Sequence, residues 1–247
     1  MSMTQTLNIG MIGLDTSHAA AFTKLLNDTS APFHVPGGRV VAAYPGGSPD
    51  FELSWSRLDR FTTTVRDEFG VGIVDSPETV AERSDAILLT SVDGRVHLEL
   101  FARIAPYGKP VFIDKPFTVT SEDARAIVAL AKKHGVPLMS SSSLRYSEDL
   151  VQALADNSAG DIFGADCYGP VELQPTQPGL FWYGIHCTEM LYAVLGRGCV
   201  RVQAHTNEDY ELVTGIWSDG RIGTIRGNRK GSRNNGALIH RTGRPGQ

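Results

Sequence analysis

The chain has 247 residues, of which 41% are hydrophobic and 20% are charged, and its formal net charge at pH 7 is −4. These values are ordinary for a globular protein with a substantial core. The negative charge argues against nucleic acid and against an anionic membrane surface as partners, because both require a basic face.

The sequence also lacks the usual signals of export and membrane insertion. No apolar run approaches the ~20 residues that a membrane span requires. The N-terminal segment 1–6 has neither the charged nor the apolar region of a signal peptide. The three cysteines are an odd number without metal-ligand spacing, which favours a reduced, cytoplasmic protein.

The first part of the chain alternates short apolar runs with segments of helical periodicity. Strands are predicted at 7–13, 38–44, 71–74, 85–90, 110–113 and 136–139. Helices are predicted at 19–27, around 58–69, from about 75, at 94–106 and at 120–135. This alternation predicts an α/β domain over residues 1–142, with a Rossmann-type, doubly wound parallel sheet.

The pattern changes after residue 142. Helices are predicted at about 146–156 and 184–195, and strand-like runs at 199–205, 209–217, 221–227 and 236–240. The segment 218–221, Ser-Asp-Gly-Arg, is a good hairpin turn between two of these runs. We therefore predict a second, α+β domain over residues 143–247, with an antiparallel sheet and a short polar tail at 241–247.

A charged motif ends the predicted strand 110–113. Asp114, Lys115 and Pro116 follow it directly, and parallel sheets present ligand-binding residues at the carboxyl ends of their strands. Lys115 is therefore a candidate active-site lysine. The alternative is a structural ion pair between Asp114 and Lys115.

The turn after the predicted strand 7–13 departs from the dinucleotide-binding pattern Gly-x-Gly-x-x-Gly. Gly13 keeps the first glycine, whereas Asp15 and His18 occupy the positions of the other two. A carboxylate about 4 Å from a pyrophosphate charge would be repelled by about 4 kcal/mol at an effective dielectric of ~20. The alternative is that Asp15 or Ser17 caps the following helix.

Other features of the same turn still suit a phosphate. Thr16 and Ser17 offer hydroxyl donors, and a helix N-terminus attracts anions. No acid follows the predicted strand 38–44 to hold a ribose diol, because that position reads Tyr-Pro-Gly-Gly-Ser over 44–48. The choice between NAD and NADP is therefore open, and so is binding of either one.

Several of these motifs together resemble the Gfo/Idh/MocA family, named for glucose–fructose oxidoreductase and inositol dehydrogenase. Asp114-Lys115-Pro116 is similar to that family's Glu-Lys-Pro. The similarity extends over residues 85–146 and continues at a later helix. The further motifs that carry it are the turn at 90–97, the arginine–aromatic pair in 143–146, and 183–191 around His186.

The resemblance implies an NAD(P)-dependent oxidoreductase acting on a sugar, polyol or related hydroxy compound. Lys115 would polarise or orient the substrate hydroxyl, and His186 would accept its proton, a task that suits histidine near neutral pH. Trp182 stands where the family often has an aspartate, one helical turn before the histidine. Glu189, one turn after His186, is the candidate that takes over the orienting role.

The resemblance also implies further site residues and an assembly. The candidate substrate-binding residues are Arg145, Trp182, Tyr183 and Glu189. The candidate cofactor-binding residues are Gly13, Asp15, Thr16, Ser17, His18, Ser91, Val92, Asp114, Lys115 and Pro116. We expect no resident metal, a cis bond between Lys115 and Pro116, and a homodimer or higher homo-oligomer formed through the open face of the second sheet. Arg145 could equally tie the two domains together.

Two other functions remain open on the sequence. The first is a divergent, redox-inactive member of the family that binds a small molecule, favoured by Asp15, His18, Trp182 and the short C-terminal part. The second is a metal-assisted lyase or hydrolase that uses Asp15, His18, His186 and Glu189, whose types suit a divalent metal. No local ligand spacing supports the second.

Overall fold

The computed structural model describes residues 6–243, and the chain divides into two compact units, Met1–Ser140 and Ser141–Gln247. The division lies two residues before the boundary predicted from the sequence. Each unit has its own sheet and its own apolar core.

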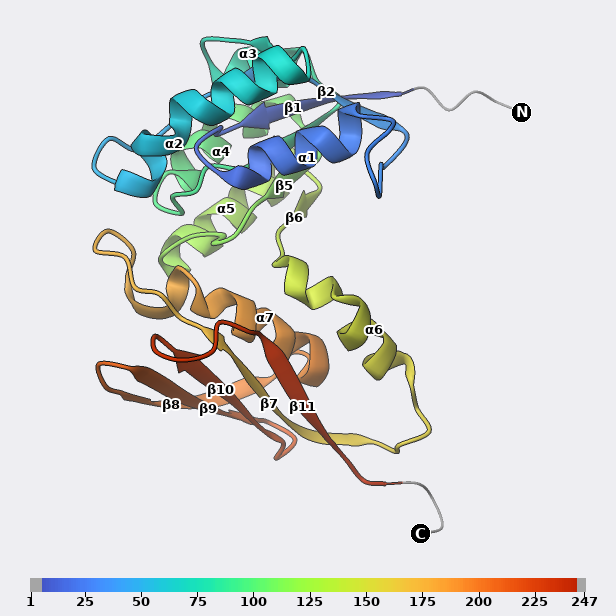
Figure 1. Cartoon of the computed structure of the whole chain (residues 1–247), viewed down its shortest axis with the longest axis vertical. Coiled ribbons are helices and arrows are strands. Elements are labelled where there is room, and N and C mark those ends of the chain that lie inside the picture. The colour runs from blue at the N-terminus through green and yellow to red at the C-terminus, as the bar shows by residue number, and fades with distance from the viewer. Residues whose placement is uncertain (1–5, 244–247) are drawn as a thin grey trace. The chain divides into compact units, whose positions relative to one another are not determined.

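The first unit contains a six-stranded sheet with the order β3-β2-β1-β4-β5-β6. Strands β1, β2, β5 and β6 of this sheet are labelled in Figure 1. Every strand pairing in it is parallel, which confirms the predicted Rossmann-type sheet. The strands are β1 (Leu7–Ile12), β2 (Gly38–Tyr44), β3 (Gly72–Ile73), β4 (Ala86–Leu89), β5 (Val111–Ile113) and β6 (Leu138–Met139).

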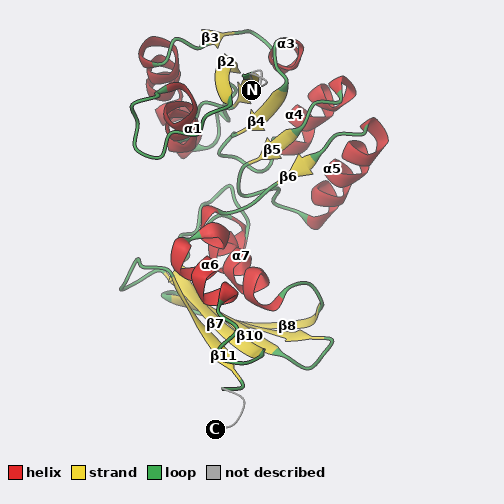
Figure 2. Ribbon diagram, turned by 90° about the vertical axis from the view of Figure 1, so that its right-hand side faces the viewer, coloured by secondary structure: helices red, strands yellow, loops and turns green. Residues whose placement is uncertain are grey.

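Helices cover both faces of this sheet. They are α1 (Ser17–Asn27), α2 (Glu52–Thr63), α3 (Pro77–Glu82), α4 (His97–Ile104) and α5 (Ser121–His134), and α2 continues as a π-helical segment at Thr64–Glu68. Figure 2 shows α1 on one face and α4 and α5 on the other. Local signals explain the ends of α5: the side chain of Thr120 accepts a hydrogen bond from Asp123 N, and Gly135 closes the helix in the left-handed conformation with φ 66°.

The second unit contains a five-stranded sheet with the order β11-β7-β10-β9-β8. Its strands are β7 (Ile162–Pro170), β8 (Cys199–Thr206), β9 (Tyr210–Trp217), β10 (Ile222–Asn228) and β11 (Gly236–Arg241). Its helices are α6 (Glu148–Ala155) and α7 (Gly184–Leu195), with short 3-10 turns at Ser143–Tyr146 and Gly179–Phe181. The bounds of α7 agree with the helix predicted at 184–195.

The second sheet departs from the predicted antiparallel sheet at one pairing. Strand β10 pairs with β7 in parallel, while the other three pairings are antiparallel. Hairpin turns fix the antiparallel course of β8, β9 and β10. No such turn connects β7 with β10, because α7 and two strands lie between them in the sequence. Packing therefore decides the direction of that pair.

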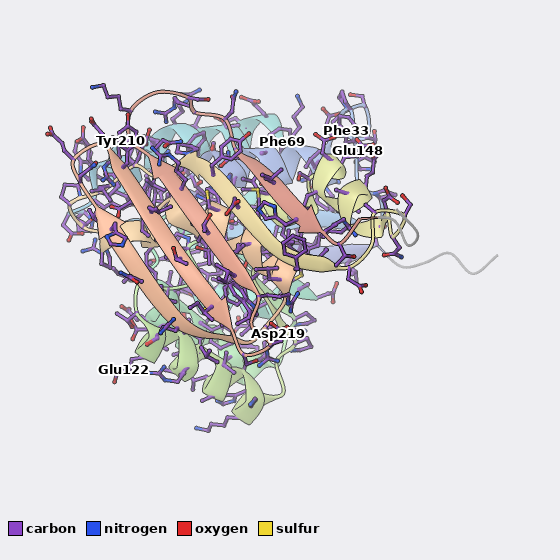
Figure 3. All side chains as sticks on the ribbon, turned by 90° about the horizontal axis from the view of Figure 1, so that it is seen from below. Phe33, Phe69, Glu122, Glu148, Tyr210 and Asp219 are labelled. Carbon is purple, nitrogen blue, oxygen red and sulfur yellow. The ribbon has the colours of Figure 1, made fainter. Side chains whose placement is uncertain are left out.

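One face of the second sheet packs against helix α7. Cys167, Leu191 and Ile225 belong to the core between them. The opposite face, shown in Figure 3, has no helix over it. We call it the open sheet face, and it exposes Tyr168, Leu212, Ile222 and Leu238. Within residues 6–243, no helix has the length and the apolar character that crossing a membrane would require.

Candidate functional site

The carboxyl ends of β1, β2 and β4 converge at one edge of the first sheet. Gly13 follows β1 with φ 93°, and a Cβ built on it would lie 2.3 Å from the backbone nitrogen and the hydroxyl of Ser91. A Cβ built on Gly46, which follows β2, would lie 3.6 Å from Gly13 Cα and 3.8 Å from Ser91 Oγ. Only glycine suits position 13, because both the conformation and the close approach exclude a side chain. The structure thus brings together the predicted site residues Gly13 and Ser91.

Asp15 occupies the second glycine position, and its side chain is fully buried. Asp15 Oδ1 accepts a hydrogen bond of 3.0 Å from Val92 N, and Oδ2 accepts one of 2.6 Å from the Ser54 hydroxyl. Ser54 Oγ in turn accepts a hydrogen bond from Ser48 N at 2.7 Å. The carboxylate therefore links the turn after β1 to the turn after β4 and to helix α2.

The alternative in which Asp15 or Ser17 caps helix α1 is wrong. Thr16 is the N-cap, and its side chain accepts a hydrogen bond of 3.3 Å from His18 N. Because Asp15 is directed into the fold, the direct repulsion between its carboxylate and a pyrophosphate also loses its basis. Burial raises the pKa of Asp15, and the hydrogen bonds from Ser54 and Val92 offset part of that rise.

His18, in the third glycine position, reaches across to the end of β5. His18 Nδ1 lies 2.5 Å from Asp114 Oδ2, and the imidazole packs against Phe22 with ring centroids 5.5 Å apart. This contact ties the N-terminal turn of α1 to the residue before Lys115. The sequence offered no signal for it, since 96 residues separate the partners.

Lys115 lies two residues after Ile113, the last residue of β5, and the bond between Lys115 and Pro116 is cis, as predicted. Burial lowers the pKa of Lys115, the charge of Asp114 opposes that effect, and the charge of Arg57 adds to it. Arg57 lies on α2 and was missed in the sequence, because nothing in its helical context distinguishes it from a surface arginine. A lysine with a lowered pKa can exchange a proton more readily than an ordinary one.

In the second unit, His186 lies in the first turn of α7. His186 Nδ1 lies 2.7 Å from Ser142 Oγ. The imidazole meets the ring of Tyr183 edge-on, with centroids 5.2 Å apart. Trp182 is buried, and its ring centroid lies 6.1 Å from that of Tyr183. Three of the predicted site residues therefore come together here.

The prediction that Glu189 orients His186 is wrong. Glu189 Oε2 instead accepts a hydrogen bond of 2.6 Å from Arg145 Nε, and the partner at His186 Nδ1 is Ser142. Two side-chain hydrogen bonds, Ser142 to His186 and Arg145 to Glu189, therefore join the segment 142–146 to α7. Sequence reasoning missed Ser142, which lies among four consecutive serines that no pattern distinguishes.

No metal-binding cluster is present in the described part of the chain: within residues 6–243, no three histidine, cysteine, aspartate or glutamate side chains gather in a way that could hold an ion. Asp15 is engaged by Ser54 and Val92, and Glu189 by Arg145. The metal-assisted alternative therefore has no ligand set among these residues.

Comparison with known proteins gives one family and several relatives. The model of the family described as "Oxidoreductase family, NAD-binding Rossmann fold" (GFO_IDH_MocA) matches residues 7–142. The inositol 2-dehydrogenase of Serratia proteamaculans is 28% identical over 172 residues, which are 66% of this chain and 45% of that protein. The uncharacterized oxidoreductase YhhX of Escherichia coli is 26% identical over 136 residues, which are 50% of this chain and 39% of that protein. The chain thus spans less than half the length of either relative.

The solved structures extend the similarity of fold to both units. The crystal structure of GenD2 from gentamicin A biosynthesis, in complex with NAD, matches 98% of this chain and 72% of that chain. The TM-score is 0.76 at 18% sequence identity. At this identity the match establishes the fold alone.

Proposed function

The chain belongs to the Gfo/Idh/MocA oxidoreductase family, and from that premise we propose that it is an NAD(P)-dependent dehydrogenase acting on a sugar, polyol or related hydroxy compound. The observation that carries the proposal is the position of Lys115. It lies at the carboxyl end of β5, in the sheet whose β1 turn holds Gly13. The similarity to an inositol 2-dehydrogenase supports the substrate class.

Unpaired polar atoms at the sheet edge fit a dinucleotide. Within the described residues, the buried hydroxyls of Ser48 and Ser91 have no hydrogen-bond partner. Ser91 Oγ lies beside Gly13 and Gly46, where ribose or phosphate oxygens would satisfy it. The N-terminus of α1, with Thr16, Ser17 and His18, would hold the pyrophosphate. Further contacts to the dinucleotide would come from Val92, Asp114 and Pro116. Asp15 would not contact the dinucleotide itself but would hold the surrounding turns in place through its hydrogen bonds to Ser54 and Val92.

The structure supplies no free acid for the ribose diol in the loop after β2. Asp50, in that loop, receives two hydrogen bonds of 2.8 Å from the guanidinium of Arg95. Tyr44, the last residue of β2, offers no carboxylate. Both NAD and NADP therefore remain in the proposal.

Lys115 and His186 are the proposed catalytic pair. The nicotinamide, when bound, would accept the hydride from the substrate carbon. Lys115 and His186 would orient the substrate hydroxyl and take part in the transfer of its proton. The proposed substrate contacts are Tyr183, Arg145 and Glu189. Arg145 and Glu189 are hydrogen-bonded to each other. Buried Trp182 packs against Tyr183 and supports its position. We also propose a cytoplasmic location, because the three cysteines of the chain are an odd number without metal-ligand spacing.

Titration of the purified protein with NADH and NADPH, followed by nicotinamide fluorescence, tests the proposal without knowledge of the substrate. We expect saturable binding, with preference for one of the two. If neither cofactor binds, the redox assignment fails, and a small-molecule-binding family member takes its place.

We also propose that the open sheet face forms a homodimer. Tyr168, Leu212, Ile222 and Leu238 expose apolar side chains on four strands of this face, and exposed apolar side chains on an uncovered sheet face support an interaction site. Ile222→Asp should therefore convert the dimer to a monomer, as measured by light scattering at micromolar concentration. Val128→Asp, at an exposed apolar position of α5 in the first unit, is the control and should leave the dimer intact. A monomeric wild-type protein would remove the claim.

A further inference from the structure

The hydroxyl of Ser142 has one proton to donate and two hydrogen-bond partners. Ser142 is fully buried, and its Oγ accepts a hydrogen bond of 3.1 Å from Leu144 N. The second neighbour is His186 Nδ1 at 2.7 Å. Among the described residues, these two are the only hydrogen-bond partners of the Ser142 hydroxyl.

This arrangement distinguishes the two tautomers of His186. A neutral imidazole donates from one ring nitrogen and accepts at the other. If Nδ1 carried the proton, Ser142 Oγ would accept two hydrogen bonds and its own buried proton would have no acceptor. Leaving a buried donor unpaired is costly, whereas donation from Ser142 to Nδ1 satisfies both groups.

We infer that Ser142 is a positioning residue that holds His186 as the neutral tautomer with its proton on Nε2. The inference rests on the proposed dehydrogenase function for its consequence, although not for its geometry. In this tautomer His186 carries its proton on Nε2, so in the proposed reaction it would donate a hydrogen bond to the substrate oxygen and would not remove the substrate's proton. In that reaction Lys115, as the neutral amine, would be the proton acceptor.

These roles account for every bond and proton in the proposed oxidation. In the proposed reaction the substrate O–H bond would break, its electron pair would form the C=O bond, and the proton would pass to the amine of Lys115. The C–H bond would break with its electron pair, and a bound oxidised nicotinamide would supply the acceptor for that hydride. His186 keeps its proton throughout.

The tautomer can be measured in the unliganded protein. Nitrogen–proton correlation spectra of protein labelled with ¹⁵N-histidine distinguish Nδ1–H from Nε2–H, and comparison with His186→Gln identifies the signals of His186 among the seven histidines. We expect the wild type to show Nε2–H. Ser142→Ala should shift the tautomer ratio about fivefold toward Nδ1–H, as loss of one hydrogen bond implies. Ser142→Thr, which keeps the hydroxyl, should behave as the wild type does.

Two outcomes would overturn the inference: a wild-type His186 protonated on Nδ1, or a Ser142→Ala spectrum in which His186 is unchanged. A misfolded Ser142→Ala protein would be recognised from its other histidine signals, and the wild-type and Ser142→Thr spectra would then decide. Failure to bind NADH or NADPH leaves these spectra unaffected. The fate of the proposed function is therefore read separately from that of Ser142.

Discussion

The Lys115→Met variant is expected to lose about a hundredfold or more of the dehydrogenase kcat while still binding the preferred cofactor. Methionine keeps an unbranched chain of similar length but has no amine to interact with the substrate hydroxyl. Proton transfer by a positioned side chain typically contributes ~10²–10⁴-fold to a rate. The measurement is nicotinamide absorbance with a panel of inositols and sugars, alongside the cofactor titration.

Lys133→Met is the matched control, because Lys133 lies exposed on α5 and should leave kcat unchanged. The pH profile adds a second criterion. Because burial lowers the pKa of Lys115 below its ordinary value of 10.5, the rate should rise with pH and level off before that value. Lys115→Met should lose this dependence, and a variant that retains the wild-type rate would exclude Lys115 from catalysis.

Asp15→Gly is expected to destabilise the first unit by about 2–4 kcal/mol and not to tighten cofactor binding. It removes the acceptor of Val92 N–H and the acceptor of the Ser54 hydroxyl. Each buried donor left unpaired costs about 1–3 kcal/mol. The repulsion of about 4 kcal/mol that the sequence suggests would instead predict tighter NADH or NADPH binding for the same substitution. Urea unfolding measures the first effect, and the fluorescence titration measures the second.

Asp15→Asn is the control that keeps an acceptor for Val92 N–H and should lose less stability than glycine does. It also tests the pKa of the carboxyl. Because burial raises the folded-state pKa of Asp15 above 3.8, the folded protein binds this proton more tightly than the unfolded chain. The contribution of protonated Asp15 to the free energy of unfolding is therefore fully present below pH ~3.8. It is lost as the pH rises through the folded-state pKa. The stability of the wild type relative to Asp15→Asn should fall across that interval, and parallel pH profiles would contradict the assignment.

The sequence by itself determined the elements and the places of the main functional residues. Apolar periodicity and helix-capping residues are local, so they located the strands of the first sheet, the bounds of α7 at 184–195, and Lys115 at the end of β5. Family motifs, which are also local, indicated His186.

Only the tertiary structure decided what each of these residues contacts. Asp15 meets Ser54 and Val92, which are 39 and 77 residues away. His186 meets Ser142 across 44 residues. The parallel pairing of β7 with β10 is likewise a contact between distant segments. A hydrogen bond between distant residues depends on how the intervening chain packs, and no local pattern records that path. The sequence could therefore place a carboxylate in a glycine motif, but only the fold shows that it turns inward and holds two loops together.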